Sequence, residues 1–438
     1  MAASTDSPSS GYRQELKRSL TVADLLVYGL VFISPTAPIA VFGIVFDTSR
    51  GMVPLVYLVG LFAMVFTAMS YMAMSRVHPV AGSVYTYTLR TIGPTAGFLV
   101  GWALLLDYLL MPTLAYVAAA IALHAAFPVV PAWLSVVGML AISTLVNYLG
   151  IETTARVNIL MLAVQVLVLL VFAIAAMAGV AHGVAGAHYA TTPFFNPAVA
   201  RPSLILAALS LGVLSFLGFD AISTLAEEAR DGPRTIARAT MLSLCLAAAL
   251  FVAQTYLASL FVPGRTAFAN DDAANAAFYD IAQTIGGYWL KFLVAIPGIV
   301  IGAAASALTA QAATARLLYS MARDRKLPAA LAHVHPQRKV PERAVLLVAA
   351  VTLVLGVTLV SQLELLTSMV CFGALVGFMA VNLAVIAPGI GLLIAACVLW
   401  NAEANAKIAG GSWLVVGIVY LLVLRMRGRA TGLPVEKP

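Results

Sequence analysis

Two acidic side chains, Asp107 and Asp220, occupy positions where a charge is costly. Asp107 lies in the apolar stretch from Phe98 to Ala122 and Asp220 in the stretch from Leu204 to Leu225, and neither stretch contains Lys, Arg or His. A carboxylate at membrane depth must face a cavity or a partner. The missing partner is a cation, and a cation that arrives as a solute would make these residues an organic-cation site. Four nearby aromatic residues can add cation–π contacts of about 0.5–2 kcal/mol each: Tyr108, Tyr116, Phe216 and Phe219.

The composition indicates an integral membrane protein. Of the 438 residues, 62% are hydrophobic and 10% are charged, and the mean hydropathy is +0.98. An ordinary soluble domain carries about 25% charged residues. A bilayer core takes about 20 apolar residues per helical span. The sequence therefore predicts an all-α fold of about twelve transmembrane helices, at residues 24–47, 53–75, 95–123, 131–149, 157–181, 203–226, 236–262, 287–315, 344–361, 365–386, 389–400 and 408–424.

The Lys and Arg residues predict the orientation. With the N-terminus inside, alternation through the spans leaves five of the 25 basic residues outside and twenty in the cytoplasm, a strong positive-inside bias. The five outside are Arg50, Arg201, Arg265, Lys291 and Lys407. The net charge of +7 thus reflects membrane topology. It is spread over many short loops, whereas a nucleic-acid partner needs one basic face.

Two spans show signs of interruption. In the first, Pro35 and Pro38 flank Thr36 and follow Ser34, and two prolines three residues apart remove backbone donors and open the helix. The sixth span carries Gly212, Ser215 and Gly218 just before Phe219 and Asp220. Broken helices at matching positions of two five-helix sets are typical of inverted-repeat transporters, whose freed backbone groups line a midplane site. The alternative is that Pro and Gly are simply common in membrane helices.

Three motifs resemble the amino acid, polyamine and organocation permease superfamily. The first motif is the loop from His78 to Tyr87, followed by Gly93, Gly97, Phe98, Gly101 and Trp102. The second runs from Phe216 to Ala221 and is followed by Glu227, Glu228, Pro233 and Arg234. The third runs from Arg316 to Asp324 and is followed by Leu327 and Pro328. The segments from Gly101 to Pro112 and from Ser215 to Glu228 are most similar to bacterial putrescine importers of that superfamily.

The resemblance implies a LeuT-like inverted repeat of five plus five helices in a bacterial inner membrane. It implies a cytoplasmic tail at 1–19, a transport core at 20–386 with repeats at about 20–181 and 203–386, two further spans at 387–424 and a tail at 425–438. Relatives place a basic connector between the tenth and eleventh spans, yet no charged residue occurs between Glu364 and Glu403. Either Pro388, Gly389 and Gly391 mark a turn in place of the connector, or the connector after Ile386 is missing from this sequence.

The expected substrate is putrescine or a similar small diamine, with Asp107 and Asp220 receiving ammonium groups. Amino-acid permeases of the superfamily generally have a Gly-rich first break whose N–H groups hold a carboxylate. Here Pro35 and Pro38 offer no N–H, and no Gly occurs between Gly29 and Gly43. The alternative within the same fold is an amino-acid permease that holds the α-carboxylate at Ser34, Pro35 and Thr36. A membrane sensor that no longer transports is a more distant alternative.

Several of these residues also have purely structural interpretations. Asp107 can tie its helix to a neighbour through hydroxyl hydrogen bonds or can be protonated, because burial disfavours the charged carboxyl. Asp220 can cap the second half-helix or organise a cytoplasmic gate. Tyr108 and Tyr116 can be packing residues. Glu227 and Glu228 are interpreted as part of a salt network at the inner surface, with a role in gating.

Energy coupling is expected to come from a proton or sodium gradient without any cofactor. The chain has no phosphate-binding loop, so it is a secondary transporter or facilitator and not an ATPase. Proton coupling through Asp107 or Asp220 is the preferred interpretation. The hydroxyls of Ser306 and Thr309 can hold sodium but more often serve helix packing. The three cysteines lie in apolar runs and the histidines are scattered, so neither disulfides nor metal centres are expected. No enzyme nucleophile is evident. Either a monomer or a homodimer is consistent with the sequence.

Overall fold

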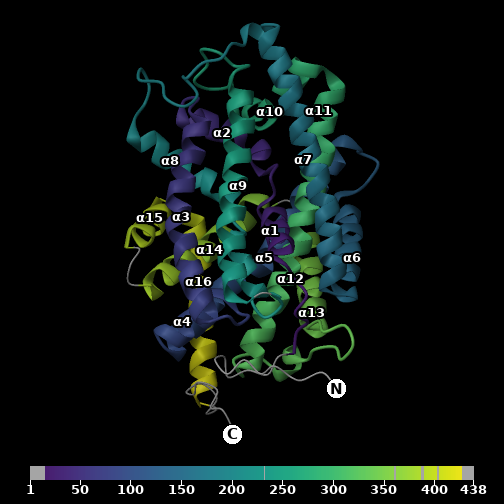
Figure 1. Cartoon of the computed structure of the whole chain (residues 1–438), viewed down its shortest axis with the longest axis vertical. Helices are drawn as coiled ribbons and strands as arrows, with labels where there is room; N and C mark the ends of the chain where they lie inside the picture. The colour runs from purple at the N-terminus through teal and green to yellow at the C-terminus, as the bar shows by residue number, and fades with distance from the viewer. Residues whose placement is uncertain (1–14, 231, 360–361, 386–388, 402–403, 427–438) are drawn as a thin grey trace.

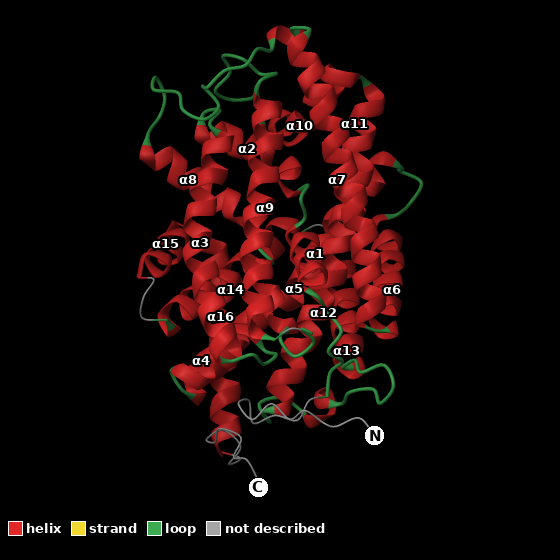
Figure 2. Cartoon of the chain, in the orientation of Figure 1, coloured by secondary structure: helices red, strands yellow, loops and turns green. Residues whose placement is uncertain are grey.

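The computed structural model describes residues 15–230, 232–359, 362–385, 389–401 and 404–426. All regular elements in these ranges are helices, and one isolated β-bridge pairs Leu20 with Ala229 (Figure 2). The elements are α1 (Val22–Ile33), α2 (Ala37–Ser49), α3 (Val53–Val77), α4 (Ser83–Thr91), α5 (Pro94–Ala126), α6 (Ala132–Leu149), α7 (Ile151–Ala181), η1 (Val184–Gly186), α8 (Pro202–Gly212), η2 (Val213–Phe216), η3 (Phe219–Leu225), α9 (Pro233–Ser259), α10 (Asp271–Gly286), α11 (Tyr288–Ala295), η4 (Ile296–Ile301), α12 (Gly302–Arg323), η5 (Ala329–Ala332), α13 (Glu342–Thr358), α14 (Leu363–Ala384), α15 (Gly389–Asn401) and α16 (Ala404–Met426).

The helices form a multi-pass membrane bundle. Most of them run along the long axis, with α10 and α11 at the upper end and α4 at the lower end (Figure 1). Nine helices of the described residues are long and apolar enough to span a membrane, or ten if the bent pair α1 and α2 counts as one span. Every one of the twelve predicted stretches coincides with a helix, but α13 has 17 residues and α15 has 13. At 1.5 Å per residue they extend about 26 and 20 Å, less than a hydrocarbon core of about 30 Å.

The first span is broken where its prolines predicted an interruption. Helix α1 ends at Ile33, Ser34 adopts a left-handed φ of 62°, and α2 begins at Ala37 after a bend of 45°. Pro38 stands in the first turn of α2, where a missing N–H is harmless because no intrahelical acceptor exists for it. The same residue type that ends one helix therefore helps to start the next.

The sixth span changes from α-helix to two short 3₁₀ segments, η2 and η3, around Gly218. Gly218 has a φ of 113°, which a side chain rarely tolerates. A Cβ atom at Gly218 would also collide with the ring of Phe32 from α1. Glycine is thus required here for both backbone conformation and space, and the two broken spans touch each other at this point.

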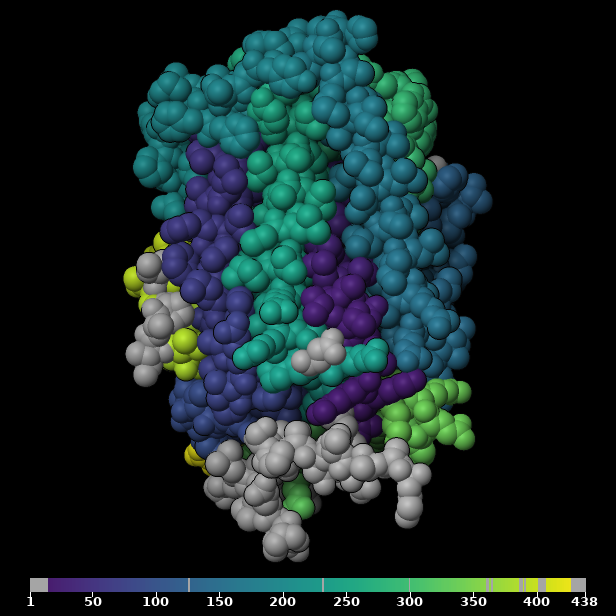
Figure 3. Space-filling view, in the orientation of Figure 1, coloured from purple at the N-terminus to yellow at the C-terminus, as the bar shows by residue number. Residues whose placement is uncertain are grey.

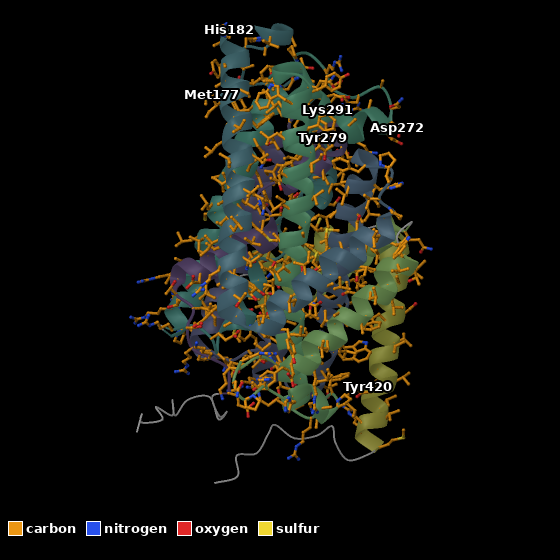
Figure 4. The ribbon with its side chains drawn as sticks, turned by 90° about the vertical axis from the view of Figure 1, so that its right-hand side faces the viewer. Met177, His182, Asp272, Tyr279, Lys291 and Tyr420 are labelled. Atoms are coloured by element: carbon orange, nitrogen blue, oxygen red, sulfur yellow. The ribbon has the colours of Figure 1, made fainter. Side chains whose placement is uncertain are left out.

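The last helix, α16, is fastened to α5 by a reciprocal tryptophan pair. Trp102 Nε1 donates to the carbonyl of Trp413 at 2.9 Å, and Trp413 Nε1 donates to the carbonyl of Trp102 at 2.7 Å. The two indole rings stack at 5.0 Å. Tyr420, near the lower end in Figure 4, stacks on Trp102 at 5.4 Å. Gly417 leaves room for the Trp102 ring, because a Cβ there would lie 2.7 Å from its Cγ atom.

Helices α14 and α15 meet on the face of α3. Asn382 of α14 accepts from Ser70 Oγ at 2.7 Å and donates to Thr67 Oγ1 at 3.1 Å. Gly391 of α15 packs against the Asn382 amide. The expected turn at Pro388, the tails at 1–14 and 427–438, and residues 386–388 as a whole lie outside the described residues. Along the chain, only residues 385–388 separate the end of α14 at Ala384 from the start of α15 at Gly389.

Replacing Trp413 by Phe is expected to loosen α16. The change removes one indole donor and part of the stack, so the free energy of unfolding should fall by about 1–2 kcal/mol. Thermal unfolding midpoints of the purified protein in detergent measure this. Trp400→Phe is the control, because Trp400 on α15 is 82% exposed and should tolerate the same change. Equal midpoints for the two variants would contradict the assigned role of the tryptophan pair.

Candidate functional site

Asp220 lies at the centre of the molecule with two tyrosine hydroxyls on one of its oxygens. Tyr108 of α5 donates to Asp220 Oδ2 at 2.8 Å, and Tyr71 of α3 donates to the same atom at 3.4 Å. Asp220 is 3% exposed. A carboxylate offers about four acceptor positions, so these two bonds hold the group in place and leave further acceptor capacity.

Asp107 precedes Tyr108 on α5 and lies against α14. Its exposure is 5%, and a Cβ atom added at Gly373 of α14 would lie 2.9 Å from its Cβ. Asp107 is the chain neighbour of Tyr108, whose hydroxyl donates to Asp220 Oδ2. Within the described part of the chain, neither carboxyl group forms an ion pair with Lys, Arg or His. Two acidic groups therefore share a buried region that contains no balancing side-chain cation.

Aromatic rings cluster beside Asp220, around its chain neighbour Phe219 and the two tyrosines that bond to it. Phe219 stacks on Phe378 of α14 with centroids 5.5 Å apart, and Tyr71 packs edge-on against Phe219 at 5.8 Å. Tyr71 also meets Tyr87 of α4 at 6.3 Å, and Phe32 lies 6.5 Å from Tyr108. Rings around a carboxylate present negative π-faces that favour an organic cation.

The break between α1 and α2 is held by hydroxyl and amide side chains. Ser34 Oγ donates to Gln165 Oε1 of α7 at 3.0 Å, and Thr36 Oγ1 donates to the carbonyl of Gly298 at 2.7 Å. Gln254 of α9 donates to the carbonyl of Pro35 at 2.8 Å. The amide of Ser34 is bonded to Leu30 O and that of Ala37 to Ser34 O, each at 2.9 Å. Few backbone donors therefore remain at this break for an anion.

Ser306 and Thr309 of α12 both contact the first half of the broken span. Ser306 Oγ donates to the carbonyl of Phe32 at 2.6 Å, where α1 ends. Thr309 Oγ1 is 2.8 Å from the carbonyl of Ser306 in its own helix, and its backbone carbonyl accepts from Tyr28 of α1 at 2.7 Å. The Ser306 hydroxyl and the Thr309 backbone carbonyl therefore fasten α1 to α12, whereas the Thr309 hydroxyl bonds within α12.

Three predicted site residues lie farther from the carboxyl groups. Ser215 shares a hydrogen bond of 3.1 Å with Tyr57 of α3. Phe216 packs edge-on against Tyr57 and Phe251. Tyr116 belongs to a small separate cluster between α5, α6 and α12 that includes Val136, Leu140 and Ala307. Gly218, by contrast, is directly beside Asp220 in the chain and packs on Phe32.

A second buried group, the carboxylate–arginine network, lies at the lower end and consists of Glu227, Glu228, Arg316 and Arg323. Arg316 of α12 holds Glu228 through both Nε and Nη2, the latter at 2.9 Å, with exposures of 3% and 0%. Arg323 pairs with Glu227 at 2.9 Å. Glu227 Oε1 also accepts from the amide of Ala81 at 3.0 Å. These pairs are far more buried than the solvated surface network expected for Glu227 and Glu228.

The segment that leads into α1 is pinned to this network. The amides of Ser19 and Leu20 donate to the carbonyl of Glu228 at 3.1 and 3.0 Å, and the amide of Arg230 donates to Leu20 O at 2.8 Å. Tyr319 donates to Glu15 at 2.9 Å. In Figure 3 this purple segment crosses the lower end of the molecule. The end of η3, the N-terminal segment and α12 therefore close the lower end together.

Some residues of the site carry no strong signal in the sequence. Tyr71 and Phe378 sit in ordinary apolar helices, and only their packing places them beside Asp220. Gln165 and Gln254 do have a signal, because each is an amide in a long apolar helix, which requires a polar partner. That partner is the first break in both cases.

Comparison with known proteins places the chain among membrane transporters. Residues 37–427 match the family model described as amino acid permease. The chain is 33% identical over 432 residues to the low-affinity putrescine importer PlaP of Escherichia coli strain K12, which covers 93% of this chain and 94% of PlaP. It is 28% identical over 353 residues to the branched-chain amino acid permease BcaP of Bacillus subtilis, with coverages of 75% and 72%. It is 25% identical over 397 residues to the methylthioribose transporter of the same organism, with coverages of 85% and 81%.

These matches confirm the resemblance to the amino acid, polyamine and organocation permease superfamily that the three motifs predicted. The family match covers most of the chain, and the described helices provide the expected multi-pass architecture. Because the relatives are permeases and transporters, the chain is not an enzyme. It belongs to the amino acid permease family of membrane transporters.

Proposed function

We propose that this transporter imports a small organic cation, putrescine or a closely related diamine, across a bacterial inner membrane by alternating access. The observation that carries the proposal is the pair of buried carboxyl groups, Asp107 and Asp220, without a side-chain cation in the described residues. A diamine has an ammonium group for each of them. Burial of two like charges without compensation is costly, so a doubly charged substrate stabilises the site when it binds.

The aromatic surround and the first break support a substrate without a carboxylate. Phe219, Phe378 and Tyr71 offer ring faces near Asp220. At the break, Pro35 lacks an N–H, and the amides of Ser34 and Ala37 are already bonded. The similarity to PlaP, a putrescine importer by name, points in the same direction.

The two broken spans support the finer architecture. We propose twelve helices in a LeuT-like arrangement, with α1–α2 and α8–η3 as equivalent broken helices of two inverted five-helix repeats. Both breaks meet at Phe32 and Gly218 in the middle of the bundle. The N-terminus is placed in the cytoplasm by the positive-inside bias, which makes the lower end the cytoplasmic end.

In this orientation the carboxylate–arginine network is the cytoplasmic gate. Its bonds from Arg316 to Glu228 and from Ala81 to Glu227 hold η3 against α12 and against the loop before α4. Opening requires these bonds to break, after which α1 and η3 can move away from α12. For coupling we favour a proton carried on Asp107 or Asp220, because the Ser306 and Thr309 hydroxyls already serve as donors to backbone carbonyls.

Asp220→Asn is expected to abolish most uptake of radiolabelled putrescine. The variant keeps an acceptor for Tyr108 but loses the charge that faces the ammonium group, and removing one partner of a buried charge pair costs about 2–5 kcal/mol. Uptake at low substrate should fall by more than about tenfold. Asp272→Asn, on the exposed first turn of α10, is the matched control. Undiminished uptake by Asp220→Asn would remove Asp220 from the site, and undiminished uptake by Asp107→Asn would remove Asp107.

Competition assays separate the diamine proposal from its main alternative. The similarity to BcaP, an amino acid permease by name, favours an amino-acid substrate held at the Ser34–Thr36 break as the second candidate. Unlabelled putrescine is expected to suppress labelled putrescine uptake more strongly than any amino acid, because only a diamine satisfies both carboxyl groups. Stronger suppression by an amino acid would favour the alternative. Absence of gradient-driven flux of either class in proteoliposomes would favour a sensor without transport.

A further inference from the structure

Pro112 interrupts the hydrogen bonding of α5 one turn after Tyr108. In an α-helix the amide of residue 112 would donate to the carbonyl of residue 108. Proline has no N–H, and its ring crowds that carbonyl. Pro112 lies inside α5, and Tyr108 is 1% exposed. The carbonyl of Tyr108 therefore loses its helical donor at a position that water does not reach freely, where an unpaired carbonyl is destabilising.

Thr314 of α12 supplies a replacement donor. Its Oγ1 atom lies 2.5 Å from Tyr108 O and 2.7 Å from Ala310 O in its own helix. The hydroxyl has one proton to share between these two acceptors. Ala310 O already accepts the helical amide of Thr314, whereas Tyr108 O has lost its amide donor. The proton therefore stabilises the structure more on Tyr108 O than on Ala310 O.

Tyr108 is thus held at both ends. Its carbonyl accepts from Thr314, and its hydroxyl donates to Asp220 Oδ2 at 2.8 Å. We propose that Thr314 is a positioning residue of the substrate site, whose hydroxyl replaces the donor that Pro112 lacks and so fixes Tyr108 at hydrogen-bonding distance from Asp220. The effect on substrate rests on the proposed function, in which Asp220 receives the cation.

The position of Thr314 on α12 connects its contact with Tyr108 to a second contact of the same helix. Two residues farther along the same helix, Arg316 holds Glu228 at the end of the segment that follows η3. Helix α12 therefore contacts both partners of the central hydrogen bond: α5 through Tyr108 O, and the η3 region through Glu228. A shift of α12 relative to α5 acts directly on Tyr108.

Thermal unfolding of single and double variants, measured without substrate, tests whether the Thr314 hydroxyl replaces the donor that Pro112 lacks. Thr314→Val should lower the thermal midpoint of the purified full-length protein, and Thr314→Ser, which keeps the hydroxyl, should restore most of it. Thr255→Val is the matched control, because Thr255 is fully buried and its hydroxyl bonds only to carbonyls of its own helix. In a Pro112→Ala background, position 112 regains an amide donor, so Thr314→Val should cost no more than Thr255→Val. An equal cost in both backgrounds would overturn the proposal.

Uptake of radiolabelled putrescine into proteoliposomes tests the positioning role. Thr314→Val should raise KM by about tenfold with a smaller change in maximal rate, and Thr314→Ser should stay within about twofold of wild type. In a Tyr108→Phe background, where no hydroxyl remains to be positioned, Thr314→Val should add less than about twofold. The same increase of KM in both backgrounds would show that Thr314 does not act through Tyr108.

Failure of the proposed function is separately visible, because the wild type would then take up no putrescine. In that case the thermal midpoints of Thr314→Val, Tyr108→Phe and the double variant decide the positioning role. The positioning role is supported if Tyr108→Phe lowers the thermal midpoint less in the Thr314→Val background than in the wild type, since the two hydroxyls then act through one residue. Additive losses overturn it.

Discussion

The structure depends on a buried carboxylate that is held by hydroxyls and not by a cation. Asp220 accepts from Tyr108 and Tyr71, and these neutral donors fix its position without neutralising its charge. Had Arg316 or Arg323 reached this carboxyl group, the site would be a closed salt bridge. Instead both arginines pair with Glu228 and Glu227 at the lower end. The described residues thus contain acids paired with arginine at the lower end and a central acid bonded to tyrosine hydroxyls.

Three carbonyls near backbone interruptions accept a hydrogen bond from a side chain of another helix. The carbonyl of Pro35 accepts from Gln254, that of Phe32 from Ser306 and that of Tyr108 from Thr314. In a membrane no water is at hand to satisfy such groups. These hydrogen bonds also connect α1 and α5 to α9 and α12. The points at which the backbone is interrupted are therefore also points at which neighbouring helices are bonded to one another.

Much of this organisation follows from the sequence. The apolar stretches located the nine or ten membrane-spanning helices of the described residues, because a lipid-spanning helix must be apolar along its length. The prolines around Thr36 and the glycines before Asp220 located the two interruptions. The sequence was less informative where helix packing determines which side chains meet. Tyr116 and Phe216, which are near the carboxylates in sequence, lie in other clusters, because neighbouring helical residues point in different directions. Tyr71 and Phe378, distant in sequence, complete the surround of Asp220.

What the sequence by itself determined is a membrane transporter with two interrupted spans and two acids that lack a nearby cation, since composition, periodicity and proline chemistry are local properties. Only the tertiary structure decided which partner each polar group takes. Glu228 pairs with Arg316, 88 residues away along the chain. Asp220 is bonded to two tyrosines and, among the residues that the structure describes, to no arginine. The reason is that the energy of a pair depends on the distance between the two groups and on their burial. Both are set when the helices pack and cannot be derived from the sequence alone.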